Sequence, residues 1–255
     1  MKEELQMRVH GDAGTPTLIY LPGLHGDWTL IGRFRKALKQ RVRFVEVTYP
    51  RTLEWSLEDY AAGVEAALAE RGISRGWVLA ESFSSSVAWR LVSRKNFRID
   101  GLVLAGGFVQ HPMIWAVRYA EWFCGAVSLA ALIRILFGYA RLARWRHRNS
   151  PEMIEGLNEF LARRTRLDQE AAKHRLHLLT KNDPRNIANQ AQVPIYAVTG
   201  LVDPIVPWVF VRRWLKKNCR DLRDYQVITL SDHNVLGNAA EKSAEQVLKW
   251  MMVVS

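Results

Sequence analysis

The chain has 255 residues, 49% hydrophobic and 24% charged, with a formal net charge of +11 and a pI of about 9.9. This is an ordinary globular composition, and a chain of this length buries enough surface to fold without disulfide or metal cross-links. Its two cysteines, Cys124 and Cys219, exclude a disulfide framework or a metal cluster. We therefore expect a protein of a reducing compartment that needs no metal or other cofactor.

The sequence contains no targeting or membrane-spanning signal that we recognise. No apolar run follows residues 1–5, so we expect no signal peptide. The most apolar charge-free stretch, 122–133, is shorter than the roughly 20 residues that a helix needs to span a bilayer. These features predict a cytoplasmic protein without a transmembrane segment.

Apolar runs typical of strands alternate with helix-like segments along most of the chain. The strands are expected at 5–10, 17–21, 42–47, 77–79, 99–104, 194–198 and 225–230. The helices are expected at 30–38, 56–72, 83–92, 208–218 and 239–253. Most of the strands are continuously apolar, which is typical of a parallel sheet covered by helices on both faces. The 42–47 strand fits this pattern least well, because it carries Arg43 and Glu46.

The alternation stops between about 111 and 190, where the sequence is helical in character. We therefore expect an α/β core made of 1–110 and 191–255, with 111–190 inserted as a helical lid. This insert carries 13 Lys and Arg against 7 Asp and Glu, more than half of the net charge. Its apolar band, 114–137, packs on the core or forms an acyl channel. Its basic cluster is a solvated helix face or a docking site for a phosphorylated carrier, and consists of Arg141, Arg144, Arg146, His147 and Arg148.

A small–x–Ser–x–small turn, Ala80 to Ser84, joins the 77–79 strand to the helix that follows. This is a variant of the Gly-x-Ser-x-Gly nucleophile elbow. Such a corner holds its serine in a strained conformation, and the residues two positions away must be small because strand and helix nearly touch. The competing interpretation makes Ser82 an ordinary N-cap of a serine-rich helix.

Three other turns follow predicted strands and carry polar or flexible residues. They are Pro22-Gly23-Leu24-His25-Gly26, the 200–207 turn with Asp203, and Ser231-Asp232-His233-Asn234. Parallel α/β sheets bind ligands at the carboxyl ends of their strands. Ser82, Asp203 and His233, in that chain order, are therefore expected to converge at one sheet edge.

From about residue 17 to the C-terminus, these four motifs resemble the α/β-hydrolase superfamily in order and spacing. The resemblance implies a doubly wound, mostly parallel sheet with an inserted helical lid and a serine nucleophile. The sequence departs from the family pattern at Ala80 and Ser84, where glycine is most usual, and at Pro22, where many members have histidine.

The resemblance also assigns roles to individual residues. Ser82 would be the nucleophile, His233 the general base and Asp203 the group that orients the imidazole. The backbone N–H groups of Leu24 and Phe83 would form the oxyanion hole. The structural alternatives are a surface position for His233 and a turn-shaping role for Asp203. His25 is either a solvated loop residue or a substrate contact.

These features predict a serine hydrolase that cleaves a small-molecule carboxylic ester through an acyl-enzyme. One alternative is a thioesterase or carrier-linked ester hydrolase whose partner is an acyl carrier protein or a coenzyme A thioester. Another is a non-catalytic binding protein on the same fold. Nucleic-acid binding is not expected, because charge alone suggests it and no recognition motif accompanies the charge. An epoxide hydrolase or dehalogenase is disfavoured, because in those relatives the elbow residue is an aspartate.

Overall fold

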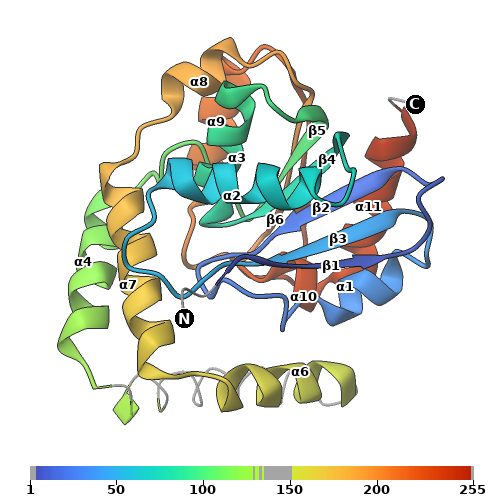
Figure 1. Ribbon diagram of the computed structural model, residues 1–255. Helices are drawn as coiled ribbons and strands as arrows, with labels where there is room; N and C mark the ends of the chain where they lie inside the picture. The colour runs from blue at the N-terminus through green and yellow to red at the C-terminus, as the bar shows by residue number, and fades with distance from the viewer. Residues whose placement is uncertain (1–3, 129, 132–133, 135–150, 254–255) are drawn as a thin grey trace.

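The computed structural model of the chain describes residues 4–128, 130–131, 134 and 151–253 (Figure 1). Its strands form one sheet with the order β1-β3-β2-β4-β5-β6-β7. They are β1 (Gln6–His10), β2 (Thr17–Leu21), β3 (Arg43–Thr48), β4 (Arg75–Glu81), β5 (Arg98–Ala105), β6 (Ile195–Gly200) and β7 (Leu222–Ile228). β1 is antiparallel to β3, and every other neighbouring pair is parallel. The predicted mostly parallel sheet is therefore confirmed.

Helices cover both faces of this sheet. The described helices of the core are α1 (Gly32–Ala37), α2 (Leu57–Ala69), α3 (Ser84–Arg94), α9 (Trp208–Asn218), α10 (Val235–Asn238) and α11 (Ala240–Val253). One apolar cluster joins α2, α3 and α9 to one face, and a second joins α1, α10 and α11 to the other. The doubly wound arrangement follows from these two clusters.

The side-chain alternation of β2 shows how the two clusters arise. Ile19 and Leu21 enter the α2–α3 cluster, whereas Leu18 and Tyr20 enter the α1–α11 cluster. All four are fully buried. A strand with apolar side chains on both faces must be covered on both sides, which is why helices pack on both faces of this sheet.

Element boundaries follow the predicted ones most closely where local signals are strong. Ser56 and Asp59 form a capping box at the start of α2, and Gly72 follows that helix with a φ of +66°. β7 begins three residues earlier than expected, because its edge position allows polar residues such as Asp224 within the strand. The short helix α10 was not predicted.

Glu46 explains why β3 fits the buried-strand pattern least well. Its carboxylate is fully buried and accepts two hydrogen bonds from Arg35 of α1, both at 2.8 Å. A third contact, at 3.0 Å, comes from His10 of β1. A buried charge is tolerated when it is paired, so this polar residue fixes α1 and β1 onto β3 instead of disrupting the strand.

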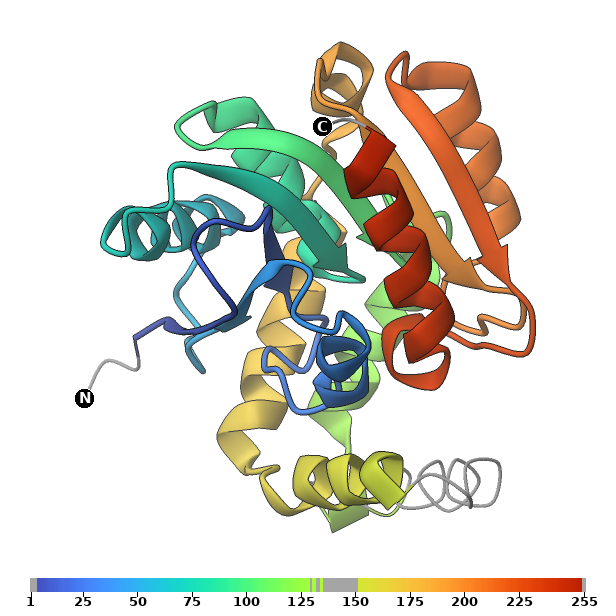
Figure 2. The same ribbon diagram turned by 90° about the vertical axis from the view of Figure 1, so that its right-hand side faces the viewer.

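The described part of the 111–190 segment contains helices and no strand. These helices are α4 (Ile114–Ala126), α6 (Pro151–Ala162), α7 (Arg166–Lys181) and α8 (Arg185–Gln190). α4 and α7 lie side by side, and Figure 2 shows them grouped with α6 at one end of the sheet. The basic cluster, Arg141 to Arg148, and much of the apolar band after 128 lie outside the described residues. No membrane-spanning helix is found among the described residues.

Candidate active site

Three loops at the carboxyl ends of β4, β6 and β7 bring Ser82, Asp203 and His233 together. His233 Nε2 lies 2.8 Å from Ser82 Oγ, and His233 Nδ1 lies 2.8 Å from Asp203 Oδ2. The other oxygen, Asp203 Oδ1, accepts the backbone N–H groups of Ile205 and Val206, each at 2.9 Å. The Asp203 side chain is fully buried, so these bonds fix the carboxylate in place.

These two contacts determine which nitrogen of the His233 imidazole carries the proton. A carboxylate only accepts hydrogen bonds, so Nδ1 of His233 carries the proton that faces Asp203. Nε2 is then the acceptor that faces the Ser82 hydroxyl. The same arrangement lets an imidazole remove a serine proton when the oxygen attacks a carbonyl carbon.

Ser82 occupies the strained corner of the elbow. Its φ is +49°, a region that non-glycine residues seldom occupy, and its N–H bonds Ala105 O at 3.0 Å. The N-cap of α3 is Phe83, without a side-chain cap, so Ser82 is not an ordinary N-cap. The flanking Ala80 and Ser84 are both completely buried.

Ser84 has a contact that the usual glycine at this position cannot make. Its hydroxyl donates to Pro22 O and accepts the Tyr49 hydroxyl, which lies at 2.6 Å. These bonds join the elbow helix to the loop after β2. The departure from the family pattern is thus accompanied by a buried hydrogen-bond chain that the sequence did not predict.

The loop after β2 places Leu24 beside the serine. Leu24 and Phe83 line the same cavity as Ser82, and within the described residues neither backbone N–H donates to another protein group. Glu81 approaches the loop from the elbow side: its Oε2 accepts the N–H of Gly23 at 3.4 Å and the hydroxyl of Tyr20. The two residues predicted to supply the oxyanion hole thus line the cavity that contains Ser82.

Arg175 of α7 holds the loop from the opposite side. Its Nη1 donates to Leu24 O at 3.0 Å and its Nη2 to Pro50 O at 3.1 Å. Gly26 has a φ of +82°, and a Cβ there would lie 2.4 Å from Nη1. The absence of a side chain at Gly26 therefore leaves room for the Arg175 guanidinium.

A cavity of about 500 Å³ contains the Ser82 and His233 side chains and extends beneath the insert. Its walls are mostly apolar and come from the strand-end loops and from α4 and α7: Leu24, Leu30, Phe108, Met113, Ala116, Val117, Ala120, Leu176, Leu179, Ile205 and Val206. His25 also lines it; the Nε2 of this histidine is buried without a described partner, and its ring packs edge-on against Phe160. A pocket of this size and lining is suited to an uncharged, apolar group.

Comparison with known proteins identifies the family. Residues 9–246 match the model of the alpha/beta hydrolase family. The chain belongs to this family. A search of curated proteins gives no match.

Many solved structures match this α/β hydrolase. A hydrolase from Pseudomonas aeruginosa PA01 is 15% identical with a TM-score of 0.78, over 97% of this chain and 94% of its own. A thermophilic esterase from Thermogutta terrifontis is 17% identical with a TM-score of 0.79, over 98% and 93%. The enol-lactonase from Burkholderia xenovorans LB400 is 17% identical with a TM-score of 0.76, over 97% and 96%. At these identities the likeness concerns the fold.

His111 supports the loop after β6, which carries Asp203 in this α/β hydrolase. The sequence analysis did not predict this role. Its Nδ1 accepts the N–H of Met113 at 3.1 Å, so its Nε2 carries the proton donated to Ile205 O at 3.2 Å. Burial lowers the pKa of His111, although its backbone hydrogen bonds act in the opposite direction. The neutral ring therefore connects the start of the insert to the loop that carries Asp203.

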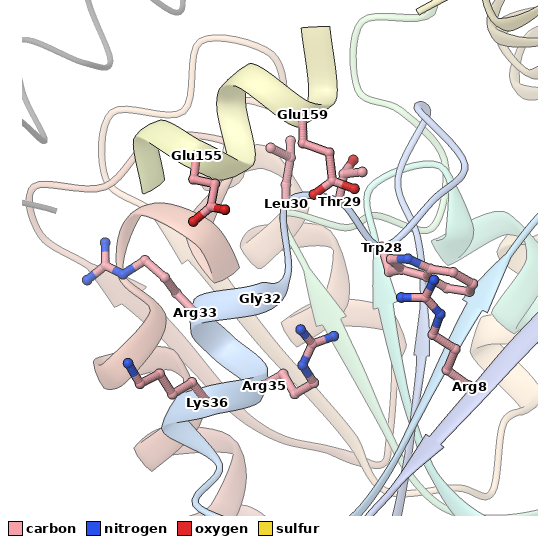
Figure 3. Close-up of a pocket in the computed structure, with 10 residues that line it drawn as sticks. All are labelled: Arg8, Trp28, Thr29, Leu30, Gly32, Arg33, Arg35, Lys36, Glu155 and Glu159. Carbon is pink, nitrogen blue, oxygen red and sulfur yellow. The ribbon is translucent and has the colours of Figure 1, made fainter. Parts of the chain in front are cut away.

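Another pocket, of about 280 Å³, lies between α1 and α6 (Figure 3). Its cations have partners within the protein: Arg35 binds Glu46, Arg33 binds Glu241, and Arg8 lies 4.0 Å from the centre of the Trp28 ring. It shares Leu30 with the serine cavity but contains none of the predicted site residues. Ser82 and His233 instead line the larger cavity.

Neither cysteine lines the serine cavity. Cys124 and Cys219 are both buried and free, and burial raises the pKa of Cys219 to about 12. Among the described residues, no three His, Cys, Asp or Glu side chains form a metal-binding group.

Proposed function

We propose that this α/β hydrolase is a serine esterase that cleaves carboxylic esters through an acyl-enzyme. One observation carries the proposal. His233 is hydrogen-bonded between the Ser82 hydroxyl and the Asp203 carboxylate, at 2.8 Å from each, inside an apolar cavity. A Ser–His–Asp arrangement with a buried aspartate, whose serine lies at a strained strand–helix corner, suits acyl transfer better than passive binding.

The acylation step follows from the hydrogen bonds. His233 Nε2 takes the Ser82 proton as Oγ bonds to the ester carbon, and the carbonyl electron pair moves onto its oxygen. Asp203 stabilises the imidazolium that forms. When the intermediate collapses, its C–O bond to the leaving group breaks and His233 protonates the departing alcohol. Ser82 is then acylated.

Deacylation repeats these steps with water. His233 takes a proton from water as its oxygen attacks the acyl carbon, and then returns a proton to Ser82 Oγ as the carboxylic acid leaves. In both steps the N–H groups of Leu24 and Phe83 would donate to the negatively charged oxygen. Two such donors typically account for a large part of the rate enhancement.

The cavity supports an apolar acyl group as the substrate class. We assign 1–110 and 191–255 to the core, and 111–190 to a lid whose helices α4 and α7 supply one cavity wall. The esterase and enol-lactonase titles among the similar structures are consistent with cleavage of an ester or of a cyclic ester. Hydrolysis of acyl carrier protein or coenzyme A thioesters stays a prediction, because the basic cluster expected to dock the carrier lies outside the described residues.

Hydrolysis of p-nitrophenyl esters, from acetyl to long acyl chains, tests the proposal. We expect Ser82→Ala to lower kcat by roughly 10⁴-fold or more with folding intact, because the nucleophile is lost. Ser93→Ala, on the exposed side of the same helix, is the matched control and keeps full activity. Wild-type turnover in Ser82→Ala would overturn the assignment. No turnover and no labelling by a fluorophosphonate would favour a binding protein with an idle triad.

A further inference from the structure

Arg175 is a buried cation in the middle of α7. Only 2% of the residue is exposed, and within the described residues no carboxylate forms an ion pair with its guanidinium. Its Nε is buried without a described partner. Burying a charge without a counter-ion is unfavourable, and a leucine or methionine would fill this position at lower cost. Stability alone therefore does not explain an arginine here.

The contacts of Arg175 indicate a different role. Its two terminal nitrogens bind two loops that follow different strands, at Leu24 O after β2 and Pro50 O after β3. The guanidinium also lies near the rings of Tyr49 and Tyr60, with its carbon 5.8 and 6.0 Å from their centres. A planar fork with fixed donors can hold two carbonyl groups at once, which an ammonium does less well.

These bonds fix the peptide groups on either side of Leu24. Gly23 is held by Glu81 at its N–H and by the Gly26 N–H at its carbonyl, 3.0 Å away. Arg175 holds the next carbonyl, that of Leu24. The Leu24 N–H lies in the same peptide plane as the Gly23 carbonyl, and Arg175 fixes the next peptide plane at the Leu24 carbonyl, so the backbone is held on both sides of the Leu24 Cα. Catalytic donors need such fixed geometry, since a misplacement of about 1 Å can cost 10²-fold in rate.

We propose that Arg175 is a positioning residue: it holds the Leu24 N–H in the orientation needed to stabilise the oxyanion. This inference rests on the proposed esterase function. It places a residue of the insert in control of a donor that belongs to the core. Arg175 touches no reacting atom and acts through the loop.

The test compares Arg175→Met and Arg175→Lys with His174→Ala. His174 is the matched control, because it precedes Arg175 on α7 and binds a core carbonyl, Trp55 O at 2.8 Å, away from the Leu24 loop. Each variant is assayed on a short soluble ester for kcat and KM, for inhibition by a trifluoromethyl ketone, and for melting temperature. The ketone forms a tetrahedral adduct with the serine and therefore reports on the oxyanion hole.

We expect Arg175→Met to lower kcat by about 10- to 100-fold, with KM changed less than about threefold and ketone affinity reduced in parallel. Arg175→Lys should recover part of the loss, because one carbonyl can still be bound. His174→Ala should keep kcat and ketone affinity even if it melts earlier. If Arg175→Met does not fold, Arg175→Lys alone decides, with a reduced kcat and an unchanged KM expected.

Two results would overturn the inference. One is a folded Arg175 variant with the kcat and ketone affinity of the wild type. The other is a His174→Ala variant with the same losses, which would indicate general loosening of α7. Ser82→Ala is assayed beside them: if it stays active, the esterase proposal itself fails, whereas an inactive Ser82→Ala beside wild-type Arg175 variants refutes this inference alone.

Discussion

At the scale of single residues, the elbow departs from the family pattern without losing its geometry. Ala80 and Ser84 are small enough for strand and helix to meet, and Ser82 keeps its positive φ. The hydroxyl of Ser84 adds a bridge between Tyr49 and Pro22. Ser84 therefore makes a structural hydrogen-bond contact at a position where glycine is usually required for steric reasons.

Ser84→Ala tests that bridge. The substitution leaves the buried Tyr49 hydroxyl and the Pro22 carbonyl without a partner, so we expect the free energy of unfolding to fall by about 1–3 kcal/mol. Urea denaturation measures the change. Tyr49→Phe removes the hydroxyl at one end of the Tyr49–Ser84–Pro22 hydrogen-bond chain. The free energy of unfolding of the double variant should fall by less than the sum of the two single-variant losses. Strict additivity would show that the two hydroxyls are not coupled.

At the scale of elements, charged side chains connect the insert to the core. Arg164, between α6 and α7, pairs with Asp27 of the loop after β2, and Arg51 pairs with Asp168 of α7 at 2.8 Å. The Arg164 and Asp27 side chains are largely buried. Such pairs are costly to break, because the remaining charge stays buried.

Asp27→Asn tests the first of these links through pH. Burial raises the pKa of Asp27, but His25, Arg164 and hydrogen bonds from Thr29 and Arg164 outweigh it and lower the pKa to about 2. A carboxyl with a depressed folded-state pKa stabilises the fold above its unfolded pKa and loses that effect as the pH falls through the folded value. We expect a cost of about 2 kcal/mol at pH 5 that shrinks as the pH falls from about 4 towards 2.

Urea denaturation at pH 5 and pH 3 measures this difference. Asp183→Asn is the control, because its partner Arg185 and its own carboxylate are both exposed to water, and such surface pairs contribute little. A cost for Asp27→Asn that stays constant with pH would indicate that the charge of Asp27 is not what stabilises the contact.

The residues that the sequence could predict are those with local signals. The apolar run of β2, the capping box of α2 and the small residues around Ser82 each lie within a few positions of one another. The order of the strand-end motifs then brings Asp203 and His233 close to Ser82. Arg175 and Leu24 are 151 positions apart, and an arginine on an amphipathic helix gives no local sign that it is buried. His111 and Glu81 were missed for the same reason.

At the scale of the whole molecule, the serine cavity lies where core and insert meet. Core loops supply the predicted catalytic groups, while α4 and α7 supply much of the apolar wall. Each buried methylene of an acyl chain is worth up to about 0.8 kcal/mol, roughly fourfold in kcat/KM. The preferred chain length should therefore be set by the insert.

Val117→Phe tests this division of roles. Val117 of α4 is 5% exposed and lines the cavity, so a larger side chain there shortens the space for the acyl group. We expect kcat/KM for long-chain esters to fall tenfold or more, while the acetyl ester changes less than about threefold. Ala126→Phe, on an exposed position of the same helix, should leave both unchanged. An equal loss for all esters would argue against a cavity that measures chain length.

The hydrogen bonds from α7 to the loops at Leu24 and Pro50 also affect how long the enzyme stays active. Proteins open locally in cooperative units well before they unfold as a whole. If α7 detaches in such an opening, Leu24 loses the hydrogen bond from Arg175, while the second apolar cluster, which joins α1, α10 and α11 to the sheet, contains no residue of α7 and stays intact. The enzyme would then lose activity at the rate at which this one helix opens, before the part of the fold around the second apolar cluster unfolds.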